Sequence, residues 1–327
     1  MNYARHIVAC ILVSVIVSSA AAQPYPIRPV FAAGSFWYKP IPADVPLNPN
    51  SAAYAAEFMR QYKAHTNAVG INMGAYSEPI YTVDGSVPTV PVTQWNCQNY
   101  LDAGLPQQWA AVPMPSYAQP ADGTDAEMAI YQPAMDTLWE FWRARQSNGQ
   151  WQACWGGKMV GVSKNPGIWP QRYGVTATGL PFAPGQITTQ ELSSGAIHHV
   201  IGIALADAEK STLFSWPANR SDGYNPKNDP NRIPEGLRFR LDPRVNIDAL
   251  KLHPVARIIA KAAQTYGFVV WDKGGAISLR FENPKVYVIA GKANPYVAIF
   301  NGTPAYAVLN GIPWDRLQFL PMDYGKP

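Results

Sequence analysis

Carboxylates and indoles are concentrated in residues 130–155, IYQPAMDTLWEFWRARQSNGQWQACW. At the two-residue period of a β-strand, this stretch divides into two unlike rows of side chains. The first, which we name the polar row, carries Gln132, Asp136, Leu138, Glu140 and Trp142. The second suits a protein core and carries Tyr131, Met135, Thr137, Trp139 and Phe141. Because indoles stack on sugar faces while amides and carboxylates bind hydroxyls, the polar row predicts a groove that binds a polysaccharide.

Asp136 and Glu140 are the candidate catalytic acids of this row, since glycosidases usually use two carboxylates. Residues four apart on one strand lie roughly 13 Å apart, whereas such enzymes separate their carboxyls by about 5–9.5 Å. A hydrolase would therefore pair one of them with an acid from another segment, such as Asp222, Glu235 or Asp272. The alternative is that both carboxylates lie on a solvated face or bind a loop amide.

Two adjacent histidines, His198 and His199, lie in a predicted strand and must face opposite sides of it. His199 shares an apolar row, which favours a hydrogen-bonded histidine in the core. His198 has small neighbours on its face, so it is the candidate general base. A polysaccharide lyase also needs groups that bind a uronate carboxylate, and residues of the right types are Gln132, Arg220 and Tyr224. Trp151 joins Trp142 as a predicted stacking residue.

These side chains would be positioned by a framework that is mainly β. Asn148-Gly149 predicts a tight hairpin, with residues 151–155 returning as a partner strand. The spacing of apolar residues predicts helices over 51–65 and 254–266, and one helical turn over 188–193. Short strands are predicted at 197–205, 211–216, 238–241, 268–271, 277–281, 286–289 and 297–300. Many short strands with few helices are typical of an antiparallel β-sandwich or jelly roll, here with about two peripheral helices.

The chain is predicted to have three parts. Residues 1–22 form a secretory signal peptide, in which basic residues precede an apolar run too short to span a bilayer, followed by small residues. Residues 23–50 form an extended Pro-rich segment that docks through Phe36, Trp37 and Tyr38. Residues 51–327 form a single β-sandwich domain. We therefore expect a secreted protein, periplasmic or extracellular, with no membrane span; an uncleaved anchor is the alternative.

Cys97 and Cys154 remain after removal of the signal peptide. An even pair without neighbouring metal ligands predicts one disulfide in an exported protein, and two free thiols are the alternative. The formal net charge of +4 and the absence of a Lys/Arg-rich run argue against a nucleic-acid partner. No motif predicts a metal or a cofactor, and the protein is expected to be a monomer.

Several phrases resemble an uncharacterised family of secreted bacterial proteins: PIPADVPLNPNSAAY, YQPAMDTLWEFWRAR, TATGLPFAPGQIT, IHHVIGIAL, SWPANRSDG and IPEGLRFRLDP. This resemblance spans most of the mature chain and brings no assigned activity. In architecture the chain resembles concanavalin-like glucanases and lyases, which implies a curved sheet that holds a glycan on its concave face. The ExDxxE motif of one glucanase group is absent. The QIH motif of one alginate-lyase group is also absent, and the most similar segment of this sequence is AIHH.

The sequence therefore predicts a secreted carbohydrate-active protein that binds a polysaccharide and, as an enzyme, cleaves it by hydrolysis or elimination. Its predicted catalytic residues are Asp136, Glu140 and His198. Its predicted substrate-binding residues are Gln132, Trp142, Trp151, Arg220 and Tyr224. One alternative is a non-catalytic glycan-binding or surface-interaction protein that uses the same groove. Another is that the polar row lies under the N-terminal segment and is structural.

Overall fold

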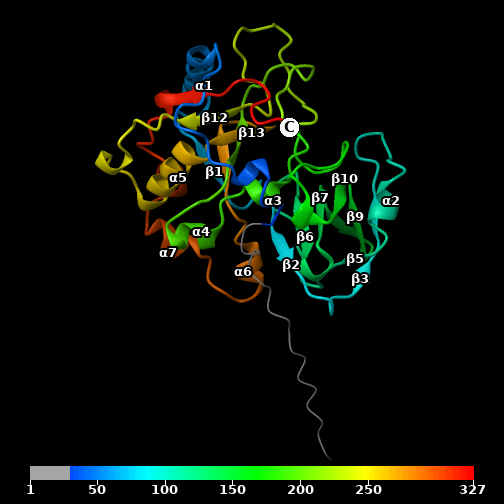
Figure 1. Cartoon of the computed structure of the whole chain (residues 1–327). Coiled ribbons are helices and arrows are strands. Elements are labelled where there is room, and N and C mark those ends of the chain that lie inside the picture. Colours follow the sequence, from blue (N-terminus) through cyan, green and yellow to red (C-terminus); the bar gives the residue numbers. More distant parts are fainter. Residues whose placement is uncertain (1–29) are drawn as a thin grey trace, which may run out of the picture.

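The computed structural model describes residues 30–327, which fold into two groups of strands that lie side by side (Figure 1). The predicted signal peptide, residues 1–22, and the first part of the Pro-rich segment lie outside the described residues. The larger group is a six-stranded sheet in the order β1-β14-β11-β13-β12-β15. Its strands are β1 (Gly70–Asn72), β11 (Ile201–Leu205), β12 (Arg238–Leu241), β13 (Phe268–Lys273), β14 (Ser278–Arg280) and β15 (Leu317–Phe319).

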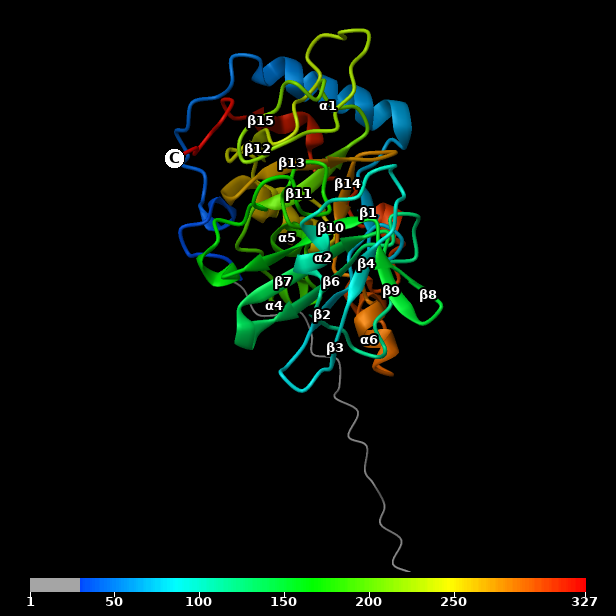
Figure 2. The ribbon, with the colours of Figure 1, turned by 90° about the vertical axis from the view of Figure 1, so that its right-hand side faces the viewer.

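The second group contains a four-stranded sheet in the order β10-β7-β6-β2 and two accessory sheets. The four strands are β2 (Ile80–Thr82), β6 (Met128–Gln132), β7 (Thr137–Trp142) and β10 (Trp155–Val160). The accessory sheets pair β3 (Thr89–Val90) with β5 (Val112–Pro113), and β9 (Gln150–Ala153) with β4 (Val92–Gln94) and β8 (Arg145–Ser147). Figure 2 shows β8 and β9 as a projecting hairpin. Asn148 and Gly149 adopt positive φ at its tip, which confirms the predicted hairpin turn.

Two long helices, α1 (Ser51–His65) and α5 (Pro254–Thr265), pack against the larger sheet and confirm both predicted helices. α5 begins at Pro254, a position where a helix needs no backbone N–H. Its Ile259 and the α1 residue Phe58 are buried in the same core as the sheet. The other helices are short: α2 (Leu105–Gln108), α3 (Phe182–Gly185), α4 (Thr189–Ser194), α6 (Lys285–Ile289) and α7 (Tyr296–Phe300). α4 confirms the helical turn predicted near residue 188, and Thr188 caps it.

The framework is mainly β, as predicted, but its strand pairing is mixed. Among the described pairs of strands, seven are antiparallel and four are parallel. The segments 286–289 and 297–300, predicted as strands, are helical, and 211–216 forms no strand, so these three predictions were wrong. Pro284 and Pro295 precede the two helices. A proline at a helix start is a signal that here outweighed the β-branched composition.

The predicted single strand through residues 130–142 was wrong, because Pro133 cannot continue a paired strand. The chain instead forms β6 and β7, which pair as an antiparallel hairpin with Gln132 opposite Thr137. A short turn joins them and ends at Asp136, whose φ is 47°. Side chains still alternate between the two faces within β7. The polar row is therefore divided between the two ends of a hairpin.

The N-terminal segment packs into the body of the protein. Trp37 is fully buried and donates its indole N–H to Gly167 O at 2.8 Å, which confirms the predicted docking at residues 36–38. Val30 and Phe31 share a hydrophobic core with Leu138 of the polar row. Leu138 of the polar row therefore lies in a core to which this segment contributes.

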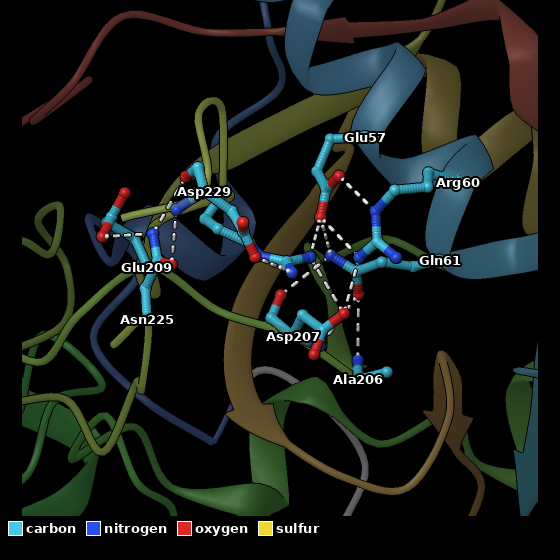
Figure 3. Close-up of polar contacts among 9 residues, drawn as sticks. Glu57, Arg60, Gln61, Ala206, Asp207, Glu209, Asn225 and Asp229 are labelled. Atoms are coloured by element: carbon cyan, nitrogen blue, oxygen red, sulfur yellow. Dashed lines mark hydrogen bonds and ion pairs between the residues drawn. The ribbon is translucent and has the colours of Figure 1, made fainter. Parts of the chain in front are cut away.

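A network of ion pairs and hydrogen bonds joins α1 to the segment 206–232 (Figure 3). The buried amide of Gln61 accepts hydrogen bonds from two successive backbone N–H groups of that segment, at 3.1 and 3.0 Å. Arg232 contacts three carboxylates, at 2.5, 2.9 and 2.7 Å: those of Glu57, Asp207 and Asp229. The network therefore fixes both ends of a long loop that contributes to the cavity described below.

Replacing Arg232 with Met should lower the free energy of unfolding by about 2 kcal/mol, because the buried Glu57 loses a charged hydrogen-bond donor. Urea denaturation followed by circular dichroism measures the change. Lys326→Met is the matched control, since the Lys326 side chain is 58% exposed and its partner Asp323 is 47% exposed, and it should leave stability unchanged. An equal loss in both variants would contradict the structural role of the network.

Candidate functional site

The structure does not gather the predicted site residues into one groove. Gln132 and Asp136 lie at the turn of the β6–β7 hairpin, whereas Trp142 lies at the other end of β7, roughly 17 Å along the strand. Gln132 is buried and donates its amide N–H to Asp84 O at 3.2 Å. Asp136 accepts hydrogen bonds from Ser163 N and Oγ at 2.8 and 2.7 Å. The structure does not bring these two residues to one site with Trp142, because neither of them lines the cavity, described below, that Trp142 lines.

Glu140 has no exposed surface, so its predicted place in an open groove was also wrong. Its carboxylate accepts hydrogen bonds from Trp169 Nε1 at 2.8 Å and from Phe182 N at 2.9 Å. Burial raises the pKa of Glu140 to about 7 despite these donors. Burial, followed by the charge of the neighbouring Glu140, raises the pKa of Glu78 well above its ordinary value. The two carboxyls form a buried pair that retains a proton near neutral pH.

The remaining predicted residues are dispersed. His198 precedes β11, and its exposed ring packs edge-on against Tyr266 with centroids 6.4 Å apart. Because β11 and β13 run parallel, His198 lies at the end of the sheet opposite to the carboxyl end of β13. Trp151 is buried in a core, and Tyr224 is 73% exposed. The adjacent His199 is buried and hydrogen-bonded, which confirms its predicted core position.

A cavity of about 510 Å³ lies between the two groups of strands. One wall comes from the end of β7 and the start of β10, and the other from the end of β13. Two of the predicted site residues, Trp142 and Arg220, line it. Its acidic residues are Asp125, Glu127, Asp222 and Asp272, and its basic residues are Arg172, Arg220 and Lys273. This volume and mixture of groups suit a small polar ligand or a short segment of a polymer.

Two carboxylates of the cavity share one buried guanidinium, that of Arg280 in β14. Arg280 Nη1 lies 2.9 Å from Glu127 Oε1, and Nη2 lies 3.0 Å from Asp272 Oδ2. The guanidinium also lies over the Phe182 ring, 4.3 Å from its centroid, which holds its plane. Because both contacts are made to one guanidinium, the two carboxyl groups lie within roughly 8 Å of each other. Such a separation is compatible with the carboxyl pair of a glycosidase.

Both carboxyls hold protons more tightly than exposed acids do. Burial raises the pKa of Glu127 to about 7 against the opposing charge of Arg280. Burial also raises the pKa of Asp272 to about 6, again opposed by Arg280. Glu127 Oε2 has no hydrogen-bond partner among the described residues, so it is the oxygen that can carry the proton. Of the two carboxyls, Glu127 holds its proton more tightly and Asp272 ionises more readily, and acid–base catalysis requires one group of each kind.

Aromatic rings line the same cavity. Trp142 is half-buried and donates its indole N–H to Asp125 Oδ1 at 3.0 Å, which fixes the orientation of the ring. The Trp155 ring lies near those of Tyr100 and Tyr173, each with centroids 6.1 Å apart. Tyr100 is 48% exposed and Trp155 is half-buried. These rings therefore offer apolar faces on which a sugar could stack.

Arg220 lines the cavity and also holds its wall in place. Its guanidinium donates hydrogen bonds to four backbone carbonyls, those of Tyr173, Gly174, Thr176 and Ala177. Its N–H groups are thereby engaged in holding the loop that forms this wall. The predicted lyase set of Gln132, His198, Arg220 and Tyr224 is not brought together, since Arg220 lines the cavity and the other three do not.

The sequence predicted part of this site but not its centre. Asp272 and Asp222 were candidates for a second acid, whereas Glu127 and Arg280 were not singled out. A signal for Arg280 was present: it is a charged residue within the apolar stretch 277–281, and a buried charge requires a partner. The identity of that partner could not be predicted, because Glu127 is 153 residues away in the chain.

Comparison with known proteins identifies no relative of this chain. No protein-family model matches it, and searches of curated proteins and of solved structures give no significant match. Within residues 30–327, no helix has the length and apolar character needed to cross a membrane. In the same residues, no group of His, Cys, Asp and Glu side chains is arranged to hold a metal ion.

Proposed function

We propose that the protein is a secreted carbohydrate-active hydrolase whose cavity binds a polysaccharide and cleaves a glycosidic bond. The observation that carries this proposal is the pair of Glu127 and Asp272, two carboxyls with raised pKa values that share Arg280. Trp142 and Trp155 line the same cavity and can stack on sugar rings. The proposed site lies in the cavity and not in a groove along the polar row. The proposed ligand is still a polysaccharide, as the sequence predicts.

In the proposed reaction, Glu127 donates its proton to the glycosidic oxygen as the bond from that oxygen to the anomeric carbon breaks. A water molecule attacks the anomeric carbon from the opposite face and gives a proton to Asp272. The products are two shorter chains, one with a new reducing end, and exchange with solvent restores the protonation of both carboxyls. Arg280 acts as a positioning residue that holds the two carboxyls apart.

Glu127→Gln and Asp272→Asn should each lower kcat/KM for polysaccharide cleavage by at least about 100-fold, because each removes a group that transfers a proton. The assay incubates the purified protein with a panel of neutral and acidic polysaccharides and measures new reducing ends. Asp136→Asn is the control and should retain activity; Asn tolerates the positive φ found there. Activity that is lost in Asp136→Asn but kept in Asp272→Asn would overturn the proposal.

The second candidate is a non-catalytic glycan-binding protein that uses the same cavity. One observation favours it: both carboxyls are already ion-paired with Arg280, as in a structural cluster. This candidate predicts no new reducing ends on any polysaccharide, but retarded migration in a gel that contains the bound polysaccharide. Trp155→Ala should then abolish the retardation. New unsaturated ends are expected from neither candidate, because the predicted lyase residues do not come together.

We also propose that the protein works in the periplasm or outside the cell, as its sequence predicts. The supporting observation is the Cys97–Cys154 disulfide, whose Cα atoms lie 5.7 Å apart, because disulfides persist mainly in oxidising compartments. The resemblance to concanavalin-like glucanases and the β-sandwich arrangement stay predictions. Cell fractionation of the native host tests the compartment, and protein found in the cytoplasm would contradict it.

A further inference from the structure

Outside the cavity, indole rings and guanidinium groups alternate along the surface. Trp142 of the cavity wall is followed by Arg143, whose Cζ lies 5.5 Å from the centroid of the Trp142 ring. The same Cζ lies 5.2 Å from the centroid of the Trp95 ring. A second guanidinium, that of Arg145, also lies over this ring, with its Cζ 3.8 Å from the centroid. We name these four residues, Trp142, Arg143, Trp95 and Arg145, the Arg–Trp ladder. It starts at the cavity wall and continues onto the β8–β9 hairpin.

The ladder is held rigidly by the backbone around it. Trp95 N donates to Ala153 O at 3.1 Å, and Trp95 Nε1 donates to Arg143 O at 3.1 Å. Two residues after Trp95, the disulfide joins Cys97 to Cys154, which confirms the bridge that the sequence predicted. Cys154 N in turn donates to the backbone oxygen of Trp142 at 3.0 Å. The covalent link therefore ties both indoles of the ladder to one framework.

Arg143 adopts a backbone conformation that Arg rarely takes. Its φ is 52°, in the left-handed region, which costs roughly 1–2 kcal/mol for a residue with a Cβ. A Gly or Asn at this position would relieve the cost, yet the chain places a long cation there, between two indoles and beside a cavity. Such strain is retained where the side chain has a use.

The charges of the ladder are available to a ligand. Among the ion pairs of residues 30–327, none involves Arg143 or Arg145, whereas Arg60, Arg232 and Arg280 all contact carboxylates. Arg145 Nε donates to the neutral Gln152 Oε1 at 3.0 Å, and no terminal nitrogen of Arg145 has a described partner. Guanidinium groups with free paired N–H donors bind carboxylate and sulfate oxygens in preference to neutral groups.

A purely structural role for the ladder is the competing explanation. Cation–π contacts at exposed sites contribute about 0.5–1 kcal/mol each, which could serve only to stiffen the hairpin. That explanation accounts for the stacking but not for two adjacent cations that lack carboxylate partners, nor for the position of the ladder at the edge of the cavity. It also makes a distinct prediction, since removing the cations would then change stability and leave ligand binding unaffected.

We propose that the Arg–Trp ladder is a binding subsite for the acidic groups of a polysaccharide chain, carboxylates or sulfates, as that chain leaves the cavity. This inference rests on the proposed function and narrows the substrate class to acidic polysaccharides. The cavity itself carries acidic and basic residues in similar numbers, so it suits the sugar unit that reacts. The ladder supplies the attraction for the charged units beyond it.

The test measures binding of the full mature protein to three oligosaccharides by titration calorimetry: a neutral glucan, an oligogalacturonate and a sulfated galactan. Arg143→Asn and Arg145→Gln should each weaken binding of an acidic ligand about tenfold and leave the neutral glucan unchanged. Asn suits the positive φ at position 143, so this variant should fold. Arg244→Gln is the matched control and should change neither. The acidic ligand that loses affinity identifies carboxylate or sulfate as the recognised group.

The remaining outcomes separate the two proposals. Equal affinity for the neutral and acidic ligands would overturn the ladder as a subsite and leave the cavity as a glycan site. If both arginine variants bound the acidic ligand as tightly as the wild type does, the proposed subsite would also be overturned. Binding to none of the three ligands would overturn the ladder and the proposed carbohydrate site together. Added salt should weaken binding of the acidic ligand and leave binding of the neutral glucan unchanged, because salt screens guanidinium contacts at the surface.

Discussion

The melting temperature of this protein is expected to fall by at least about 5 °C as the pH rises from about 5 to about 8. The main cause is the buried pair of Glu78 and Glu140. Burial raises the pKa of Glu140 to about 7, and burial with the charge of Glu140 raises the pKa of Glu78 well above 4.5. In the unfolded chain both carboxyls ionise near 4.5. The folded protein therefore binds more protons than the unfolded chain in this pH range, and stability is lost as the protons leave.

The size and sign of this effect follow from the same pKa values. One carboxyl whose pKa is raised from 4.5 to about 7 changes the free energy of unfolding by roughly 3 kcal/mol across the transition. Glu127 and Asp272, with pKa values raised to about 7 and about 6, act in the same direction. Asp242, whose hydrogen bond from Arg244 lowers its pKa to about 2, acts in the opposite direction. Its stabilisation is lost only below about pH 4 and does not offset the loss at higher pH.

Glu78→Gln isolates the contribution of the buried pair. The amide supplies an N–H that can donate to Glu140 without having to bind a proton from solvent. This variant should match the wild-type melting temperature near pH 5 and exceed it near pH 8, as scanning calorimetry would measure. Asp315→Asn, at an exposed position, should follow the wild-type profile. A wild-type melting temperature that stays constant or rises between these pH values would show that the pair does not hold its proton.

Loss of the Cys97–Cys154 disulfide is expected to lower the free energy of unfolding by about 4 kcal/mol. The bridge joins residues 57 apart in sequence, so it removes many conformations from the unfolded chain. The loop that it closes includes β6, β7 and β9, and it ends where β10 begins at the cavity. Urea denaturation of the double variant Cys97→Ser/Cys154→Ser measures the loss, which corresponds to a fall of roughly 10 °C in melting temperature.

A reducing agent provides the control for the disulfide. Treatment of the wild-type protein with a reductant under denaturing conditions, followed by refolding, should reproduce the stability of the double variant. The same treatment should have no effect on the double variant, which contains no bridge. A double variant within about 1 kcal/mol of the wild type would mean that the unfolded chain is already compact around this loop.

Features that depend on neighbouring residues could be predicted well. Pro254 at a helix start and the spacing of apolar residues located α5, and the same spacing located α1. Asn148-Gly149 located the β8–β9 turn, because two successive positive φ angles favour these residues. The pair Cys97–Cys154 could be predicted by arithmetic alone, since export leaves two cysteines.

The errors arose where a local signal was outweighed or overlooked. A strict two-residue alternation through Pro133 suggested one long strand, although proline ends paired strands. The β-branched residues of α6 and α7 suggested strands, although each segment follows a proline that can begin a helix. The parallel pairing of β11 with β13 could not be predicted, because it joins strands more than 60 residues apart without a repeating strand–helix unit between them.

By itself, the sequence determined the residue types that the candidate site would use: indoles near Trp142, acids such as Asp272, and a disulfide beside them. Only the tertiary structure decided which of them meet. It buried Glu140 beside Glu78 and brought Glu127 and Asp272 to the two sides of Arg280. The reason is physical: the proton affinity and solvent access of a carboxyl depend on the charges and the burial around it. Those surroundings come from segments far apart in the chain.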